Sequence, residues 1–361
     1  MRKLIGLYVI FSFLCASSLW AKASPQKEKT SPKQKQTIWK LQAQSTENTP
    51  DFKILKDFSK KIKDLSNNKF IIEIIPSGKK AIASGANLFE AVKSDKVEMA
   101  KGWPNYWHQY DSGWAAIQGV PFGFMNYTSS MMYMFEGEGI KLANDLAKPH
   151  GIIWRPAWWI GMEIGILTKT EVKKLADLKD KRIRVGPGVS GETFNDAAKN
   201  FSIPTVPEKI PELLKVNMLF GVEWTVPAAT YARDYHKQLP YIIGPAVWQP
   251  SSLSDFLINE KAYNKLSQKQ REILELSIKS LTLSATLKGK KMDIEALEKF
   301  KKDGVKISKW SEEDMKIWKK SAEKIISKYE KKSPSFKKIM DSKRMFMEQY
   351  KSYFEIFGAY D

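Results

Sequence analysis

The residues that most clearly point to chemistry lie around Arg184. Arg184 ends a short predicted strand, and the run GPGVSG at residues 186–191 follows it and opens a predicted helix. A guanidinium and a glycine-rich helix N-terminus both attract anions, so this segment predicts a binding site for a small carboxylate. The run also matches GxGxxG. We do not predict a dinucleotide site, because Pro187 stiffens the turn and no acidic residue follows at the end of a second strand.

Two carboxylates in separate segments are the next candidates. Glu163 and Glu223 could form a pair near one cleft, where their charges would repel each other and raise the pKa of one of them. A bound Ca²⁺ or Na⁺ would remove that cost and offer the ligand a second anchor. In the alternative, Glu163 pairs with a nearby arginine such as Arg155 and no metal is present.

No arrangement for catalysis is evident. The chain lacks G-x-S-x-G and HExxH, and its three histidines, His108, His150 and His236, lie far apart. Clustered tryptophans, Trp158-Trp159 and Trp248, could instead form a rigid apolar wall around a small organic acid, or belong to the core. The residues therefore favour capture of a ligand over its conversion.

Composition limits the class of protein. The 361 residues allow two or three domains, and 43% hydrophobic and 27% charged residues exclude a chain that is disordered throughout. One cysteine, Cys15, excludes a disulfide scaffold. The net charge of +19 is spread over lysine-rich stretches and not gathered into one patch. We therefore predict a solvated surface and no nucleic-acid partner.

The N-terminus reads as an export signal. Arg2 and Lys3 precede an uncharged, largely apolar run at residues 4–19, and Ala21-Lys22-Ala23 is an A-x-A cleavage site. Residues 1–23 are thus predicted to be a cleaved signal peptide and the mature protein to be periplasmic. Residues 24–37 contain no hydrophobic residue and predict a disordered tether.

The remaining pattern alternates strands and helices. We predict strands at 38–44, 69–75, 97–100, 152–154, 164–168, 182–185 and 221–224. Helices are predicted from Pro50, capped by Thr49, and at 84–93 and 192–200. Ser267 and Gln270 form a capping box that opens a helix to about residue 302, long enough to span more than one lobe. Ser311 caps a further helix, and Ser333-Pro334 precedes the last. The predicted fold is α/β, a two-lobed periplasmic-binding-protein clamshell with a long helix spanning both lobes.

The predicted lobes are discontinuous in sequence. Residues 38–158 with 250–285 form lobe 1, and residues 159–249 with 286–330 form lobe 2. Residues 331–361 form a C-terminal helix that either packs on its own lobe or mediates a homodimer.

Four segments carry a family resemblance. They are VPFGF at 120–124, LADLKDKRIRVGPG at 175–188, GVEWTVP at 221–227 and WQPSSLSDFLIN at 248–259. In this order they resemble the substrate-binding proteins of tripartite ATP-independent periplasmic (TRAP) transporters, the DctP family, over residues 38–330. The chain is most similar to the branch that binds 2-oxo or 2-hydroxy monocarboxylates, such as pyruvate or lactate, together with a cation.

The resemblance implies a site. Arg184 would salt-bridge the ligand carboxylate, and a Ca²⁺ or Na⁺ ion would be held by Glu223, Trp224 and Glu163. The substrate-binding residues implied are Arg184, Glu163, Trp159, Trp224, Trp248 and Tyr106. The implied partners are a small organic acid and the membrane permease subunits of a TRAP transporter, and no catalysis is expected.

The chain departs from that branch at several positions. Thr225-Val-Pro-Ala-Ala replaces Gly-Pro-Tyr-Asp-Asp after the Glu-Trp pair, Glu163 stands where a glutamine usually serves the cation, and Trp159 replaces an asparagine. An extra carboxylate favours a divalent ion such as Ca²⁺. Two alternatives stay open: the same fold binding another organic acid without metal, and an exported enzyme that acts on a small acid.

Overall fold

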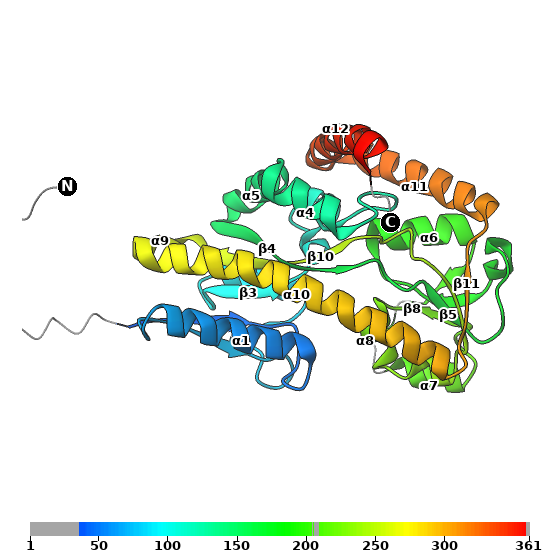
Figure 1. The fold of residues 1–361 in the computed structure, drawn as a ribbon, viewed down its shortest axis with the longest axis horizontal. Helices are drawn as coiled ribbons and strands as arrows, with labels where there is room; N and C mark the ends of the chain where they lie inside the picture. The colour runs from blue at the N-terminus through cyan, green and yellow to red at the C-terminus, as the bar shows by residue number, and fades with distance from the viewer. Residues whose placement is uncertain (1–35, 204, 206–208, 359–361) are drawn as a thin grey trace, which may run out of the picture. The chain divides into compact units, whose positions relative to one another are not determined.

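The computed structural model describes residues 36–203, 205 and 209–358 (Figure 1). The predicted signal peptide and all but the last two residues of the predicted tether lie outside the described residues. Among these described residues, no helix combines the length and the apolar character needed to cross a bilayer.

The first lobe is built on a mixed sheet with strand order β2-β1-β3-β10-β4 among the described residues. Its strands are β1 (Thr37–Gln42), β2 (Phe70–Ile75), β3 (Met99–Gly102), β4 (Ile152–Gly161) and β10 (Ser252–Asn259). β1 is parallel to β2 and β3, as the strand–helix–strand pattern predicts, whereas β10 runs antiparallel to β3 and β4. β4 is longer than predicted and reaches the point where the chain leaves this lobe.

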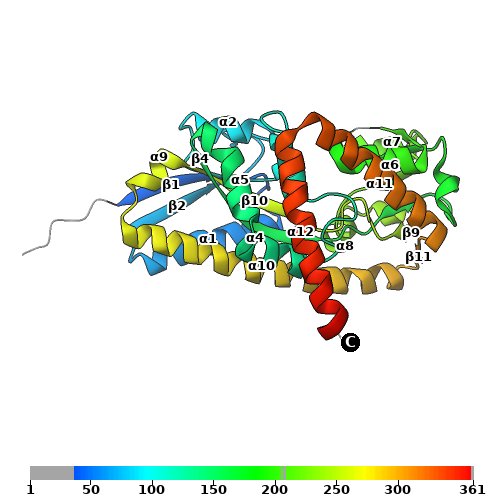
Figure 2. The ribbon, with the colours of Figure 1, turned by 90° about the horizontal axis from the view of Figure 1, so that it is seen from above.

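Helices cover both faces of this sheet (Figures 1 and 2). They are α1 (Pro50–Leu65), α2 (Asn87–Lys93), α3 (Gly113–Gln118), α4 (Tyr127–Glu136), α5 (Gly139–Ala147) and α9 (Glu260–Lys265). The side chain of Thr49 caps α1 by accepting the N–H of Phe52, as predicted, and the helix buries Leu55, Phe58 and Ile62. Burial of this apolar stripe holds α1 on the sheet.

The second lobe contains a sheet of order β11-β9-β5-β8-β6-β7 among the described residues. Its strands are β5 (Ile166–Thr168), β6 (Arg182–Arg184), β7 (Phe201–Ser202), β8 (Gly221–Glu223), β9 (Tyr241–Gly244) and β11 (Lys306–Lys309). Its helices include α6 (Gly188–Ala198), α7 (Ile210–Lys215) and α8 (Pro227–Tyr231). α6 begins four residues earlier than predicted, within the glycine-rich run, because its first turn packs closely on the preceding turn.

Three long helices complete the fold. α10 (Gln268–Lys302) starts at the predicted Ser267–Gln270 capping box and packs on α1 and β4 at one end and on α8 at the other (Figure 1). α11 (Glu312–Lys332) is capped by Ser311, and α12 (Pro334–Phe357) follows Ser333. The two-lobed α/β prediction with a long helix across both lobes is confirmed. The exact lobe boundaries stay a prediction.

A buried polar cluster lies inside the first lobe. The Oδ2 atom of Asp255 on β10 accepts the indole N–H groups of Trp107 at 2.8 Å and Trp154 at 2.7 Å. Burial raises the pKa of the Asp255 carboxyl to about 7, against the opposing effect of these hydrogen bonds. Gly102 permits this packing, because a Cβ there would lie 2.4 Å from the Trp107 ring.

Candidate functional site

Arg184 and Glu223 meet because their strands are parallel neighbours. β6 and β8 pair with Arg184 opposite Val222, so both strands present their carboxyl ends at the same edge of the second sheet. Arg184 Nη1 donates to the Glu223 carbonyl at 2.7 Å and to Glu223 Oε2 at 3.2 Å. Both side chains are largely buried, at 15% and 5% exposure. The carboxyl ends of strands are the usual ligand-binding edge of such sheets.

The other edge of the Arg184 guanidinium takes no part in the contacts to Glu223. Its Nε atom is buried and has no hydrogen-bond partner among the described residues. Nε and Nη2 form the planar fork that can hold a carboxylate through two parallel bonds. The contact to Glu223 through Nη1 therefore orients the guanidinium and leaves this fork available to an anion.

The glycine-rich run at residues 186–191 also holds the carboxylate of Glu223. The Gly186 N–H donates to Glu223 Oε2 at 3.0 Å. Glycine is required at 191, because a Cβ there would lie 1.9 Å from the Gly186 carbonyl oxygen. The run thus folds into a tight turn that fixes Glu223 beside the first turn of α6.

Glu163 lies beside Glu223 on the connection between β4 and β5. It is 4% exposed, and Gln249 Nε2 donates to its Oε1 at 3.1 Å. Its Oε2 is buried without a hydrogen-bond partner in the described part of the chain. Burial first, and then the neighbouring Glu223 charge, raise the pKa of Glu163 well above its ordinary value. The pair therefore needs either a proton or a cation.

The alternative partner for Glu163 is wrong. Arg155 donates from Nε and Nη2 to the two carboxylate oxygens of Glu275, both at 2.9 Å. Glu275 is on α10, so this forked ion pair fastens β4 to the long helix. The Arg155 guanidinium is used in this ion pair, so it does not supply a counter-charge to Glu163.

Two aromatic residues from different lobes interact with Arg184, one through a ring contact and one electrostatically. The Trp224 ring lies 4.5 Å from the Arg184 guanidinium carbon, a cation–π contact. Tyr106 comes from the first lobe, on a 3-10 helix at Pro104–Trp107. Burial raises the pKa of Tyr106, and the positive charge of Arg184 partly opposes this rise. Tyr106 is therefore within electrostatic reach of Arg184 from across the lobes.

The other two predicted tryptophans are core residues. Trp159 is fully buried, and its Nε1 donates to Ser130 Oγ at 2.8 Å. Trp248 packs its ring against Phe194 and Trp318 in the second lobe. The structure thus brings together Arg184, Glu163, Glu223 and Trp224, and it places Trp159 and Trp248 in the packing behind them. Tyr106 is 37% exposed and lies within electrostatic reach of Arg184.

Gln249 is a residue of this region that sequence reasoning missed. It contacts both Glu163 and Ser252, the latter at 2.8 Å, from the segment that leads from β9 back to β10. That segment contacts the β4–β5 connection, since the Ala246 N–H donates to the Glu163 carbonyl at 3.3 Å. Gln249 lies within the family-like WQPSSLSDFLIN segment, which was the signal available.

The site holds fewer metal-ligating side chains than a self-sufficient metal centre. Among the described residues, no group of three or more His, Cys, Asp or Glu side chains could hold a metal ion. Glu163 and Glu223 nevertheless fit a hard cation in part, because they are adjacent carboxyl groups and Glu163 Oε2 has no hydrogen-bond partner among the described residues. Backbone carbonyls, water and oxygens of a bound acid would have to complete the coordination.

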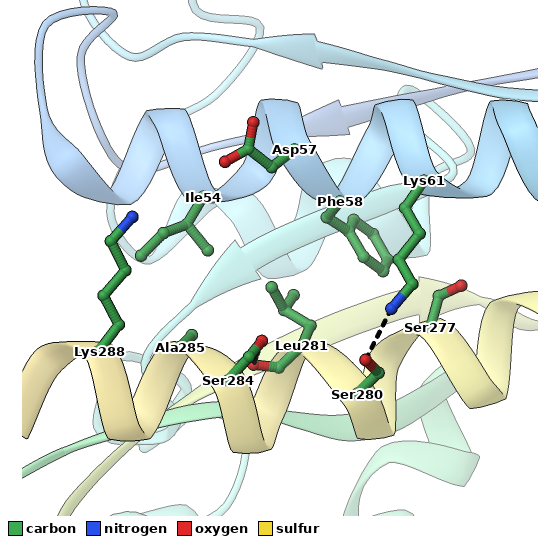
Figure 3. Close-up of a pocket in the computed structure, with 10 residues that line it drawn as sticks. All are labelled: Ile54, Asp57, Phe58, Lys61, Ser277, Ser280, Leu281, Ser284, Ala285 and Lys288. Atoms are coloured by element: carbon green, nitrogen blue, oxygen red, sulfur yellow. Dashed lines mark hydrogen bonds between the residues drawn. The ribbon is translucent and has the colours of Figure 1, made fainter.

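A separate pocket lies on the first lobe, between α1 and α10 (Figure 3). Its lining includes Asp57, Lys61 and three serines of α10, and Lys61 Nζ donates to Ser280 Oγ at 2.7 Å. The lining includes none of the five residues Arg184, Glu163, Glu223, Trp224 and Tyr106. It is therefore distinct from the carboxylate site.

Comparison with known proteins gives a consistent result. The family model for bacterial extracellular solute-binding protein, family 7 (DctP), matches residues 42–332. A monocarboxylate 2-oxoacid-binding periplasmic protein of Nostoc sp. (strain PCC 7120) is 24% identical over 291 residues, which cover 81% of this chain and 79% of that protein.

Solved structures share the fold. A TRAP periplasmic solute-binding protein from Colwellia psychrerythraea, with bound calcium and pyruvate, is 24% identical with a TM-score of 0.80, covering 89% of this chain and 97% of that one. One from Pseudoalteromonas atlantica T6c, with bound sodium and pyruvate, is 23% identical with a TM-score of 0.79 and the same coverage.

Proposed function

We propose that this chain captures a 2-oxo or 2-hydroxy monocarboxylate together with a cation. The chain belongs to family 7 of the bacterial extracellular solute-binding proteins, the DctP family, and the proposal proceeds from that membership. Pyruvate and lactate are representative ligands. The family consists of extracytoplasmic receptors that deliver solutes to membrane permeases and not of enzymes, so the exported-enzyme alternative is set aside. Export through cleavage of residues 1–23 belongs to this proposal.

One observation carries the choice of ligand. Arg184 lies beside two adjacent carboxyl groups, Glu163 and Glu223, and is the arginine whose charge acts on both. The Nε and Nη2 donors of Arg184 are not used by either of them. A monocarboxylate satisfies the fork, while its 2-oxo or 2-hydroxy oxygen lies on the side of the carboxylates. The pyruvate named in two related structures and the 2-oxoacid in the Nostoc protein's name support this choice.

The proposed mechanism is capture between lobes. Arg184 binds and orients the carboxylate of the ligand. The Trp224 ring packs against the guanidinium and holds its plane in the orientation that this binding requires. A cation, when bound, would supply the positive charge that Glu163 and Glu223 lack and that the ligand's oxygens need. Tyr106 approaches from the first lobe, so closure around the crossing segments excludes water and strengthens the ion pair.

The test of the ligand class is a thermal-shift screen of small organic acids. A ligand that binds only the folded state raises the melting temperature. We expect pyruvate, lactate and longer 2-oxo monocarboxylates to raise it by several degrees, and acids without an oxygen at carbon 2, such as propionate, to have much smaller effects. Equal shifts with propionate and pyruvate would contradict the proposal, because the second anchor would then be absent.

The proposal includes a homodimer through the second half of α12. The first half buries Phe336, Ile339 and Met340 and packs on α3, so this part of the helix lies on its own lobe. The second half leaves Tyr353 at 57%, Ile356 at 65% and Phe357 at 63% exposure. Figure 2 shows this end projecting beyond α10. A second copy presenting the same face would bury it.

Sedimentation velocity tests the dimer. We expect the mature protein to sediment as a dimer at micromolar concentration and the Tyr353→Ser, Phe357→Ser double variant as a monomer with unchanged acid affinity. The variant Tyr241→Ser changes a tyrosine outside α12 and serves as the control that stays dimeric. A monomeric wild type at 50–100 times that concentration, on the order of 100 μM, would contradict the proposed dimer.

A further inference from the structure

A cavity of about 400 Å³ lies between α11, α12 and the segment 120–124, and we refer to it as the α11–α12 cavity. Figure 2 shows the two helices that form its walls. Its apolar lining includes Val120, Phe122, Phe124, Ala322, Ile326 and Met340. None of the residues gathered around Arg184 contributes to it, so it is independent of the proposed solute site.

A buried lysine lines this cavity. Lys343 on α12 is 5% exposed, and its ammonium donates a hydrogen bond to the carbonyl of Ala116 in the last turn of α3. The rings of Phe124 and Tyr133 lie 5.3 and 5.8 Å from its Nζ. An ammonium has three donors, and among the described residues no acidic side chain forms an ion pair with Lys343.

The charges around the cavity do not balance. Three cations line it, Lys319, Lys343 and Arg344, against two carboxylates, Glu323 and Glu330. Glu330 is already paired with Arg344 at 2.6 Å, and Glu323 is exposed at the rim. The positive charge that stays uncompensated is therefore the buried one.

Burial of an unpaired ammonium is unfavourable. Desolvation lowers the pKa of Lys343 to about 7, with no neighbouring carboxylate to oppose the change. A hydrogen bond to one carbonyl and two ring contacts recover only part of the lost hydration. An anion inside the cavity would supply the missing partner, and an apolar chain attached to it would fill the rest of the space.

We propose that the α11–α12 cavity binds a medium-chain alkyl carboxylate, with its carboxylate on the Lys343 ammonium and its chain against the apolar lining. The proposal does not rest on the proposed transport function. The same cavity borders Phe122, whose N–H donates to the Val247 carbonyl of the second lobe at 3.0 Å. The ligand would therefore lie against a segment that joins the two lobes.

Calorimetry with octanoate as the probe tests the proposal. We expect about one octanoate per chain to bind the wild type and the affinity to fall at least tenfold in Lys343→Met, which keeps an unbranched side chain one atom shorter and removes the charge. Met is easier to bury than an unpaired lysine, so this variant should melt no lower than the wild type. Lys337→Met, an exposed position on the same helix that pairs with Asp341, is the matched control and should bind octanoate normally.

Two further comparisons make the result decisive. 1-Octanol carries the same chain without a charge and should bind at least tenfold more weakly than octanoate to the wild type. Octanoate should bind Arg184→Ala as it binds the wild type. Equal affinity of Lys343→Met and the wild type, or loss of binding in Arg184→Ala, would overturn the proposal, the second by placing the acid in the solute site. Absence of octanoate binding to the wild type would overturn it as well.

Discussion

Replacing Arg184 by alanine is expected to weaken pyruvate binding by about 2–5 kcal/mol, at least about 30-fold, because the buried carboxylate loses its only forked partner. Arg184→Lys should weaken it at least tenfold. Lysine keeps the charge but cannot supply two parallel N–H donors from one plane, nor hold the Glu223 carbonyl with the same geometry. Titration calorimetry with pyruvate measures both effects.

Arg182 provides the matched control for Arg184. It lies on the same strand two residues away, and its guanidinium donates to the Asn217 carbonyl at 3.0 Å on the exposed surface. Arg182→Ala should leave pyruvate affinity unchanged. Melting temperatures of all three variants should be compared, because Arg184 also holds Glu223. Near-native affinity in Arg184→Ala and Arg184→Lys would remove Arg184 from the site.

Removal of the cation is expected to have the second large effect. Metal analysis should find about one Ca²⁺ or Na⁺ per chain, and chelation of a divalent ion should lower pyruvate affinity. Glu223→Gln should lower both metal content and affinity, since it removes one of two anionic ligands. Full pyruvate affinity in metal-stripped protein would contradict the cation and leave Arg184 as the main anchor.

Glu163→Gln separates a cation from a proton at this pair. Glu163 has no hydrogen bond to Arg184, so this variant changes the pair without releasing the guanidinium. If a cation occupies the site, loss of one negative charge should weaken Ca²⁺ binding more than Na⁺ binding. If Glu163 simply carries a proton, the neutral glutamine should leave metal content and pyruvate affinity at their wild-type values.

Local signals predicted the elements well. Thr49, Ser267 and Ser311 each cap the helix that the sequence assigns to them, because a cap depends only on a side chain and the N–H groups two or three residues later. The antiparallel position of β10 between β3 and β4 was not predicted. It joins residues about 100 to 150 positions apart, and strand pattern alone does not encode such pairing.

The site was predicted in part. Arg184 and Glu223 carried readable signals, a strand end before a glycine-rich turn and a Glu-Trp pair, but their contact depends on the parallel register of β6 and β8. Trp159 and Trp248 show the limit of composition. An aromatic residue in a strand fits a ligand wall and a core equally, and here the packing partners Ser130 and Phe194 decide for the core.

Arg155 failed as a predicted partner for a related reason. It is eight positions from Glu163 in the sequence, yet it lies within β4 where its side chain meets α10, while Glu163 lies beyond the end of the strand on the connection between the lobes. Sequence proximity could not reveal that Glu275, 120 residues later, takes both donors.

The buried Asp255 has a consequence for proton linkage. Its pKa is about 7 in the folded chain and near 3.8 when exposed. Between those values the folded chain binds a proton that the unfolded chain has released, so the free energy of unfolding contributed by this group falls as pH rises from about 4 to 7. Asp196 has the opposite dependence. Burial acts to raise its pKa, but the hydrogen bonds and charges of its partners, Lys324 first, outweigh burial and lower the pKa, so its contribution is lost only as pH falls below about 4. Together these two carboxyls favour the folded state most in mildly acidic surroundings.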